Sequence, residues 1–102
     1  MIKRHKMSKK TEETIKSFLS YSPEDGLLRW RKAPTGFILA GNRAGRKHQN
    51  GHLCVCVDKK EYMAHHVAWL LYYGEMPKTS VFHLNGNKAD NRIGNLSLTK
   101  GD

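Results

Sequence analysis

Apolar side chains recur at helical spacing in two stretches of the chain. In the first, an apolar stripe follows Thr11, which can cap a helix, and two glutamates that suit the positive end of a helix dipole. This pattern predicts a short helix over residues 11–19. The second stretch, residues 64–73, is richer in large apolar residues, and Gly74 follows where a helix would stop. We expect this second helix to pack on a sheet.

Shorter apolar runs predict strands. Turn-forming residues 22–26 precede a run at 27–30, and residues 58–60 join a strand at 52–57 to a partner at 61–63. The glycine-rich stretch 33–51 predicts loops or short edge strands, and the polar stretch 79–102 predicts two brief strands around a long loop. The expected fold class is α+β: a small antiparallel sheet packed on one main helix, within a single domain over residues 11–102.

Positive charge is concentrated in the middle of the chain. The 102 residues contain 18 Lys and Arg against 9 Asp and Glu, a net charge of +9, and residues 29–60 carry eight cations and one acid. A concentrated cationic field suits the phosphates of nucleic acid, although charge runs are often only a solvated face. Interleaved Trp30 and Phe37 favour nucleic acid. The predicted contact residues are Arg29, Arg31, Lys32, Arg43, Arg46, Lys47, Lys59 and Lys60.

The N-terminal residues and the apolar runs indicate where in the cell the protein acts. Residues 1–10 hold five cations and no acid, as a flexible basic arm would. The longest apolar run, residues 67–73, is far short of the roughly 20 residues that span a bilayer, and the start lacks the apolar segment of a signal peptide. We therefore expect an intracellular protein with no membrane partner. Cys54 and Cys56 stand too close together to form a disulfide framework.

Histidines and cysteines raise the question of zinc. His52, Cys54 and Cys56, with His65 or His66, offer the ligand types that zinc prefers, but the spacing of the two cysteines is unlike that of zinc knuckles. Buried cysteines are also common as small hydrophobic residues. For His65 and His66 we expect one ring to point into the domain, as a hydrogen-bonded structural histidine. No local pattern marks a nucleophilic serine or cysteine.

Four ordered motifs resemble the phage-type HNH homing endonucleases. They are HLNGNKADNRIGNL at 83–96, YSPEDGLLRW at 21–30, AGNRAG at 40–45 and AHHVAWLLYYGEMP at 64–77. The resemblance covers about residues 17–99. It implies a ββα-metal finger over residues 79–102, attached to a DNA-binding part of sheet and helix over residues 27–73. The implied activity is hydrolysis of phosphodiester bonds in double-stranded DNA, in the host cytoplasm if the chain is phage-encoded.

The resemblance also implies roles for individual residues. His83, before the Asn-Gly turn, stands where the family has the base that activates water, and an imidazole with its ordinary pKa near 6.5 accepts a proton at neutral pH. Asn95 matches the residue that braces the finger and orients that histidine. A divalent ion, Mg²⁺ or Mn²⁺, is implied beside them. Asn85-Gly86 and Asp90-Asn91 are also ordinary turn formers, and this explains much of the pattern of Asp90, Asn91 and Arg92, but not that of His83.

The chain departs from the family pattern at the residues that are expected to bind the divalent ion. Phe82 stands where an acid or amide usually precedes the histidine, and the sequence ends at Asp102 without the helix that supplies a second ligand. The ion could be held by Asn95, Asp102 or substrate phosphate, or a partner could supply ligands. Alternatively, the protein binds DNA without cutting it, with a sheet and helix like those of the plant ethylene-response type of DNA-binding domain. A third class, a factor that binds an acidic protein surface, predicts no DNA retention at physiological salt.

Overall fold

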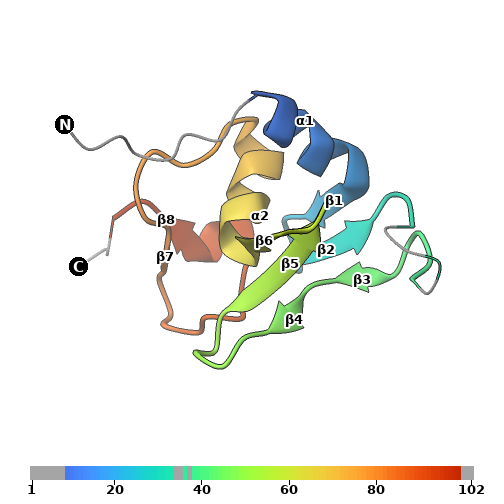
Figure 1. Ribbon diagram of the computed structural model, residues 1–102. Coiled ribbons are helices and arrows are strands. Elements are labelled where there is room, and N and C mark those ends of the chain that lie inside the picture. Colours follow the sequence, from blue (N-terminus) through green and yellow to red (C-terminus); the bar gives the residue numbers. More distant parts are fainter. Residues whose placement is uncertain (1–8, 34–35, 37, 100–102) are drawn as a thin grey trace.

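The computed structural model describes residues 9–33, 36 and 38–99. Two helices, eight short strands and one 3-10 turn follow one another along this part of the chain (Figure 1). In order they are α1 (Lys9–Phe18), β1 (Leu19–Ser22), β2 (Leu27–Trp30), β3 (Arg43–Ala44), β4 (Arg46–Lys47), β5 (Leu53–Val57), β6 (Lys60–Met63), α2 (Ala64–Tyr73), β7 (Phe82–His83), η1 (Ile93–Asn95) and β8 (Leu96–Ser97).

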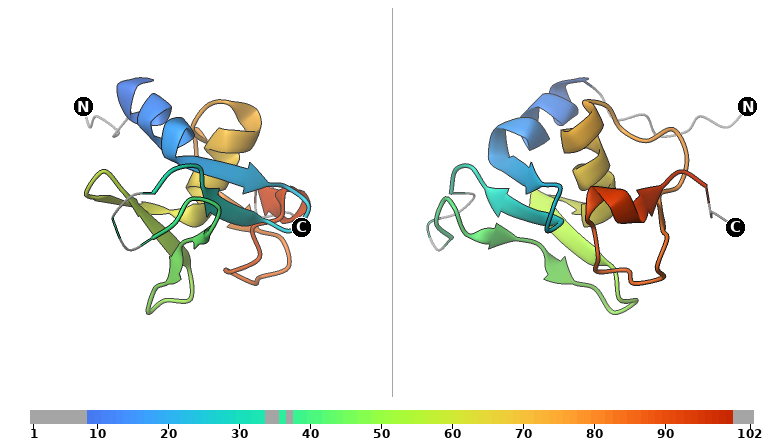
Figure 2. Two further views of the ribbon diagram at one scale, coloured as in Figure 1. Left: turned by 90° about the vertical axis from the view of Figure 1, so that its right-hand side faces the viewer. Right: turned by 180° about the vertical axis from the view of Figure 1, so that it is seen from behind.

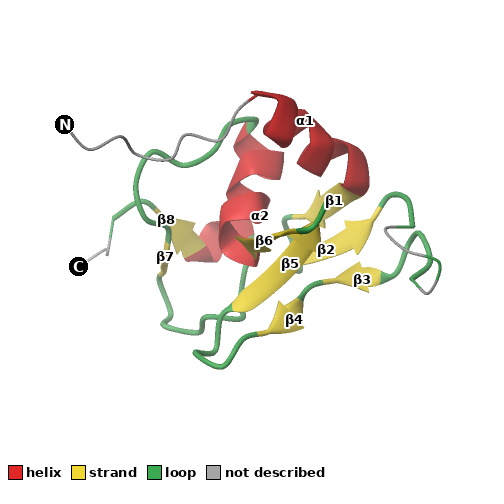
Figure 3. Ribbon diagram, viewed as in Figure 1, coloured by secondary structure: helices red, strands yellow, loops and turns green. Residues whose placement is uncertain are grey.

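The strands form three small antiparallel sheets (Figure 3). Their orders are β1-β2-β3, β4-β5-β6 and β7-β8. β3 and β4 are separated only by Gly45, whose φ of 108° favours glycine, so residues 43–47 form an outer edge shared by the first two sheets. The α+β class is confirmed, with three sheets in place of the single sheet expected.

Helix α2 lies at the centre of the molecule. It contacts β1, β5 and β6 and also α1 and η1, and Figure 2 shows it between α1 and the β7–β8 pair. Its bounds match the predicted 64–73, and it ends at Gly74, whose backbone N–H donates to the carbonyl of Leu70 in a left-handed cap. Val67 and Leu70 are fully buried in a core shared with Ile15 and Leu19.

A smaller apolar cluster attaches the C-terminal segment to α2. Ala68, Val81 and Leu96 are its buried members, and Trp69, Ile93 and other partly buried residues pack around them. The β7–β8 pair therefore rests on one side of α2 while the two larger sheets and α1 occupy the other sides (Figure 2).

Two details of the N-terminal part differ from the sequence predictions. The first helix spans Lys9–Phe18, so Thr11 lies within it and Lys9 and Lys10 belong to the helix and not to a basic arm; residues 1–8 and Phe37 lie outside the described residues. Leu19, expected at the end of this helix, instead begins β1 opposite Trp30. Pairing with β2 buries Leu19 completely, and this tertiary gain outweighs its helix propensity.

The remaining predicted strands are recovered closely. β2 has the predicted bounds, β5 begins one residue later than expected, and β6 begins one residue earlier, at Lys60. The turn between them places Asp58 and Lys59 at positive φ, as a tight two-residue hairpin requires. Within residues 9–33, 36 and 38–99, no helix has the length and apolar character needed to cross a membrane.

Candidate functional site

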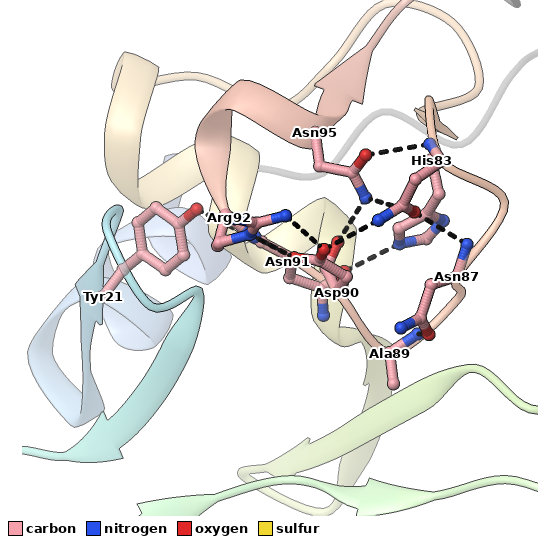
Figure 4. A network of polar contacts seen from close by, with 9 residues as sticks. Tyr21, His83, Asn87, Ala89, Asp90, Asn91, Arg92 and Asn95 are labelled. Carbon is pink, nitrogen blue, oxygen red and sulfur yellow. Dashed lines mark hydrogen bonds and ion pairs between the residues drawn. The ribbon is translucent and has the colours of Figure 1, made fainter.

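The loop between β7 and β8 is closed by the side chain of Asn95. Its Oδ1 accepts a hydrogen bond from the backbone N–H of Asn85, and its Nδ2 donates to Asn85 Oδ1 and to the carbonyl oxygen of Asp90, each at 2.9 Å (Figure 4). Asn95 is buried, so water does not compete for these hydrogen bonds. Asn95 therefore braces the loop, as the family resemblance implies.

Asx turns shape the rest of the loop. The side-chain oxygens of Asn85, Asn87 and Asp90 each accept from the backbone N–H two residues later. Asp90 also forms a two-pronged ion pair with Arg92, with N–O distances of 2.8 and 2.7 Å. Hydrogen bonds from Arg92 hold the pKa of the Asp90 carboxyl well below its usual range. The turn-forming interpretation is thus correct for these residues.

Asn91 plays a different part. It is buried, and its Oδ1 lies 2.7 Å from Nε2 of His83 (Figure 4). Among the described residues, Asn95 makes no hydrogen bond to the His83 ring, because its amide is committed to the loop. The expectation that Asn95 orients His83 through a hydrogen bond is therefore wrong, and Asn91 occupies that place.

The β1–β2 hairpin contacts this segment through strand β1 and through the turn that follows it. The Tyr21 hydroxyl donates to the carbonyl of Asn91, and the backbone N–H of Ile93 donates to the carbonyl of Pro23. Burial raises the pKa of the Tyr21 phenol, which remains a hydrogen-bond donor at physiological pH. Gly26 approaches so closely that a Cβ atom there would lie 2.4 Å from the Arg92 nitrogen. Segments 70 residues apart in sequence are thus locked together.

Four imidazole rings meet beside this loop. His65 lies 4.9 Å from His83, 5.0 Å from His52 and 4.5 Å from His66, measured between ring centres. His65 is 4% exposed, and burial lowers its pKa to about 3; burial also lowers the pKa values of His52 and His66. Burial therefore favours the neutral form of these three rings, His52, His65 and His66. His65 is the inward ring, as expected, but its Nδ1 is buried without a hydrogen-bond partner.

The possible metal ligands among the described residues do not form an ion-binding site, here called an ion cradle, by themselves. Within the part of the chain that the structure describes, no three or more His, Cys, Asp or Glu side chains converge in a way that could hold a metal ion. Cys54 is buried in β5 while Cys56 is exposed, so the two thiols do not share a site with His52. The zinc hypothesis is not supported, and the phenyl ring of Phe82 offers no ligand to any ion.

The cations of residues 29–60 fall into two groups. Four of them interact within the chain: Arg29 with Asp25 at 3.9 Å, Arg46 with Glu61 at 2.9 Å, Arg31 through its Nε to the carbonyl of Leu19, and Lys32 over the Phe18 ring. The others, Arg43, Lys47, Lys59 and Lys60, are exposed and make no ion pair with any described residue. These four are the cations most available to a phosphate backbone.

The basic stretch and the β7–β8 loop are distant in sequence but adjacent in space. The Nζ of Lys88 donates to the carbonyl of Asn50 at 3.0 Å, and the rings of His52 and His83 lie 6.0 Å apart. The turn between β4 and β5 therefore lies against the loop that follows His83. Lys47, at the end of β4, leads directly into this turn.

The segment that holds His83 is similar to a known protein family. Residues 62–100, which include α2, His83, Asn91 and Asn95, match the family model described as HNH endonuclease. The match covers less than half of the chain and supports an HNH nuclease family, which implies a nucleic-acid substrate. Neither the comparison with curated proteins nor that with solved structures gave a match.

Sequence reasoning missed two residues of the site. Asn91 has the same local signature as its turn-forming neighbours, and only its burial and its contact with His83 distinguish it. The sequence predicts only a structural role for His65, because its proximity to His83 depends on how α2 packs against β7. The His65-His66 pair at the start of an apolar helix was the available signal, since imidazoles are seldom placed there without a polar neighbour.

Proposed function

We propose that this protein is a DNA endonuclease of the HNH homing type, which hydrolyses phosphodiester bonds in double-stranded DNA with His83 as general base. The observation that carries the proposal is the match of residues 62–100 to HNH endonucleases at the segment where His83 is held by a buried asparagine. The concentration of cations in residues 29–60, and the contact of their turn with the loop after His83, support DNA as the substrate.

The proposed reaction is in-line hydrolysis. The imidazole of His83 removes a proton from a water molecule as the water oxygen attacks phosphorus, and the bond from phosphorus to the leaving sugar oxygen breaks. The leaving oxygen then takes up a proton from solvent. His83 is partly exposed, so water and a phosphate can reach it.

The proposal assigns no step to a metal ion. The family resemblance implies Mg²⁺ or Mn²⁺, but the described residues do not form an ion cradle on their own. Assays therefore include each ion separately and a chelator, so that any requirement for an ion is measured directly.

A supercoiled plasmid tests the activity. We expect conversion to open-circular or linear DNA in the presence of Mg²⁺ or Mn²⁺, and at least a 100-fold slower reaction for His83→Ala, the order that a general base contributes. His48→Ala, an exposed histidine next to β4, is the matched control and should cleave normally. Equal rates for wild type and His83→Ala in both ions would remove His83 as the base.

The second candidate function is DNA binding without cleavage. The observation that favours it is that the described residues include no group of three or more possible metal ligands, together with Phe82 beside His83. In that case the wild type leaves plasmid intact under every ion condition while still binding DNA with a steep salt dependence.

The proposed DNA contacts, here called the binding track, are tested separately from cleavage. We propose that Arg43, Lys47, Lys59 and Lys60 contact phosphates, and that the internally engaged Arg29, Arg31, Lys32 and Arg46 contribute where DNA displaces their partners. Arg43→Gln with Lys47→Gln should lower the slope of log affinity against log salt by about 2. Lys9→Gln with Lys10→Gln removes the same charge from α1, on the opposite side of the molecule from β4 (Figure 1), and should leave the slope unchanged. Equal effects of the two double variants would contradict the proposed track.

A further inference from the structure

We infer that Asn91 is a positioning residue that fixes the tautomer of His83, with the proton on Nε2 and the lone pair on Nδ1. The significance of this assignment for catalysis rests on the proposed function, in which His83 is the general base. The assignment itself concerns the free protein and can be tested without any cleavage.

The hydrogen bond between the two side chains determines the tautomer. Asn91 Oδ1 lies 2.7 Å from Nε2 of His83, and a carbonyl oxygen can only accept. The proton must therefore reside on Nε2. A neutral imidazole carries one ring proton, so Nδ1 is left with the lone pair that a general base needs.

Asn91 can impose this choice because its surroundings hold it in place. Asn91 is 3% exposed, so water does not compete for its Oδ1. Its backbone carbonyl accepts the Tyr21 hydroxyl, and a Cβ atom at Gly26 would lie 2.6 Å from its carbonyl carbon. These contacts come from the β1–β2 hairpin, Tyr21 from strand β1 and Gly26 from the turn, outside the segment that matches HNH endonucleases. The N-terminal hairpin thereby acts on the chemistry of His83.

Neighbouring groups hold the backbone and the ring of His83 in position. The backbone around His83 is fixed by pairing with Leu96 and by the N–H of Gly86, which donates to the His83 carbonyl. The ring of His65 lies against the ring of His83. Asn95 does not compete, because its amide closes the loop through Asn85 and Asp90. Asn91 is thus the asparagine that sets the ring proton.

Nitrogen NMR of the ring tests the inference in the wild-type protein. At pH 8, above the ordinary histidine pKa, two-bond nitrogen–hydrogen correlations distinguish the two neutral tautomers. We expect His83 to show a protonated Nε2 and an unprotonated Nδ1. A protonated Nδ1 in wild type would overturn the inference, and this measurement does not depend on the folding of any variant.

Two substitutions sharpen the result. Asn91→Leu removes the acceptor, and the His83 signals should move toward an average of both tautomers; Asn91→Asp keeps an acceptor oxygen and should keep Nε2 protonated. Asn42→Leu makes the same chemical change at an exposed site and should leave His83 unchanged. A folded Asn91→Leu protein whose His83 retains the wild-type tautomer would also overturn the inference.

Cleavage then separates this inference from the proposed function. At saturating protein, Asn91→Leu should cut DNA at least about 10-fold more slowly than wild type with unchanged DNA affinity, because the base is misoriented rather than lost. An inactive wild type with Nε2 protonated removes the proposed function and leaves the positioning by Asn91 intact. An active wild type with Nδ1 protonated does the reverse.

Discussion

Two regions of this small protein are held together by different forces. The larger region, built from α1, α2 and the first two sheets, has a core of buried apolar side chains that includes Ile15, Leu19, Val67 and Leu70. The β7–β8 loop has almost no apolar interior, and Asn85, Asp90, Asn91 and Asn95 hold its shape through side-chain hydrogen bonds.

This difference means that the stability of the fold and the precise orientation of side chains depend on different regions. Apolar burial is roughly proportional to area and has no directional preference, so it fixes which elements pack together more firmly than it fixes individual atoms. Hydrogen bonds have narrow geometry and orient the groups they join. We therefore expect substitutions in the large core to unfold the molecule, and substitutions in the loop to disturb His83 while the rest stays folded.

The largest effect should come from the apolar core. Leu70 is fully buried in α2, and Leu70→Ala should lower the free energy of unfolding by about 2–5 kcal/mol through lost transfer energy and a cavity. Leu84, at 52% exposure in the loop, is the matched control, and Leu84→Ala should change it by less than about 0.5 kcal/mol. Urea unfolding followed by circular dichroism measures both, and similar losses would show that the two regions are not distinct.

The junction between the regions should be almost as sensitive. Gly26 and Gly86 have similar positive φ values of 75° and 78°, but a Cβ atom at Gly26 would overlap the backbone of Asn91 and Arg92, whereas Gly86 faces open space. Gly86→Ala should cost about 1–2 kcal/mol from backbone strain alone, and Gly26→Ala should cost clearly more.

Native-state hydrogen exchange locates the damage from these glycine variants. Gly26→Ala should raise exchange at the loop amides of Asn85 and Asn95 more than at those of β5. Equal free energies of unfolding for the two variants would contradict the tight contact between the β1–β2 turn and the loop.

Acidification should act on the imidazole cluster. The pKa of folded His65 is about 3, below the ordinary value near 6.5, so the unfolded chain binds the proton first. Stability is therefore intact above about pH 6.5 and falls as the pH drops, by up to about 1.4 kcal/mol per pH unit for each such group. His52 and His66 shift in the same direction.

The slope between pH 6.5 and 4.5 isolates the histidines. In this window the Asp90 carboxylate stays ionised both folded and unfolded for most of the range, so its contribution is nearly constant. His65→Leu should flatten the dependence of unfolding free energy on pH, and His48→Leu, at an exposed position, should not. An unchanged slope in His65→Leu would contradict the neutral, buried state of this ring.

The smallest effect should come from the surface ion pair between β4 and β6. Arg46 and Glu61 are 2.9 Å apart, but their side chains are 76% and 43% exposed. Arg46→Ala should lower the free energy of unfolding by at most about 1 kcal/mol, and less in high salt. A larger loss would mean that the edge of the sheet depends on charge.

Much of this organisation could be predicted from the sequence. Helix α2 was predicted because its apolar residues and its terminal glycine agree, and β2 and β5 because their patterns were bounded by turn residues. β1 was missed because its four residues become a strand only through pairing with β2. Local pattern does not encode that pairing.

The same limit applies to the site. His83 and Asn95 are singled out by the resemblance to HNH endonucleases, whereas the contact of Asn91 with His83 depends on packing against Gly26 and Tyr21, which lie far earlier in the chain. The cations of residues 29–60 seemed separate from the His83 segment along the chain. Folding brings the turn before β5 against the loop after His83, so the two are neighbours.

The central claim is that His83 is the general base of a DNA endonuclease. The most direct measurement is the single-turnover rate of plasmid cleavage at saturating protein, where differences in DNA affinity no longer contribute. The account predicts that wild type cleaves in Mg²⁺ or Mn²⁺ and that His83→Ala, bound to the same DNA, reacts at least 100-fold more slowly. A His83→Ala protein that cleaves at the wild-type rate, or a wild type that binds DNA and never cleaves it, would contradict the claim.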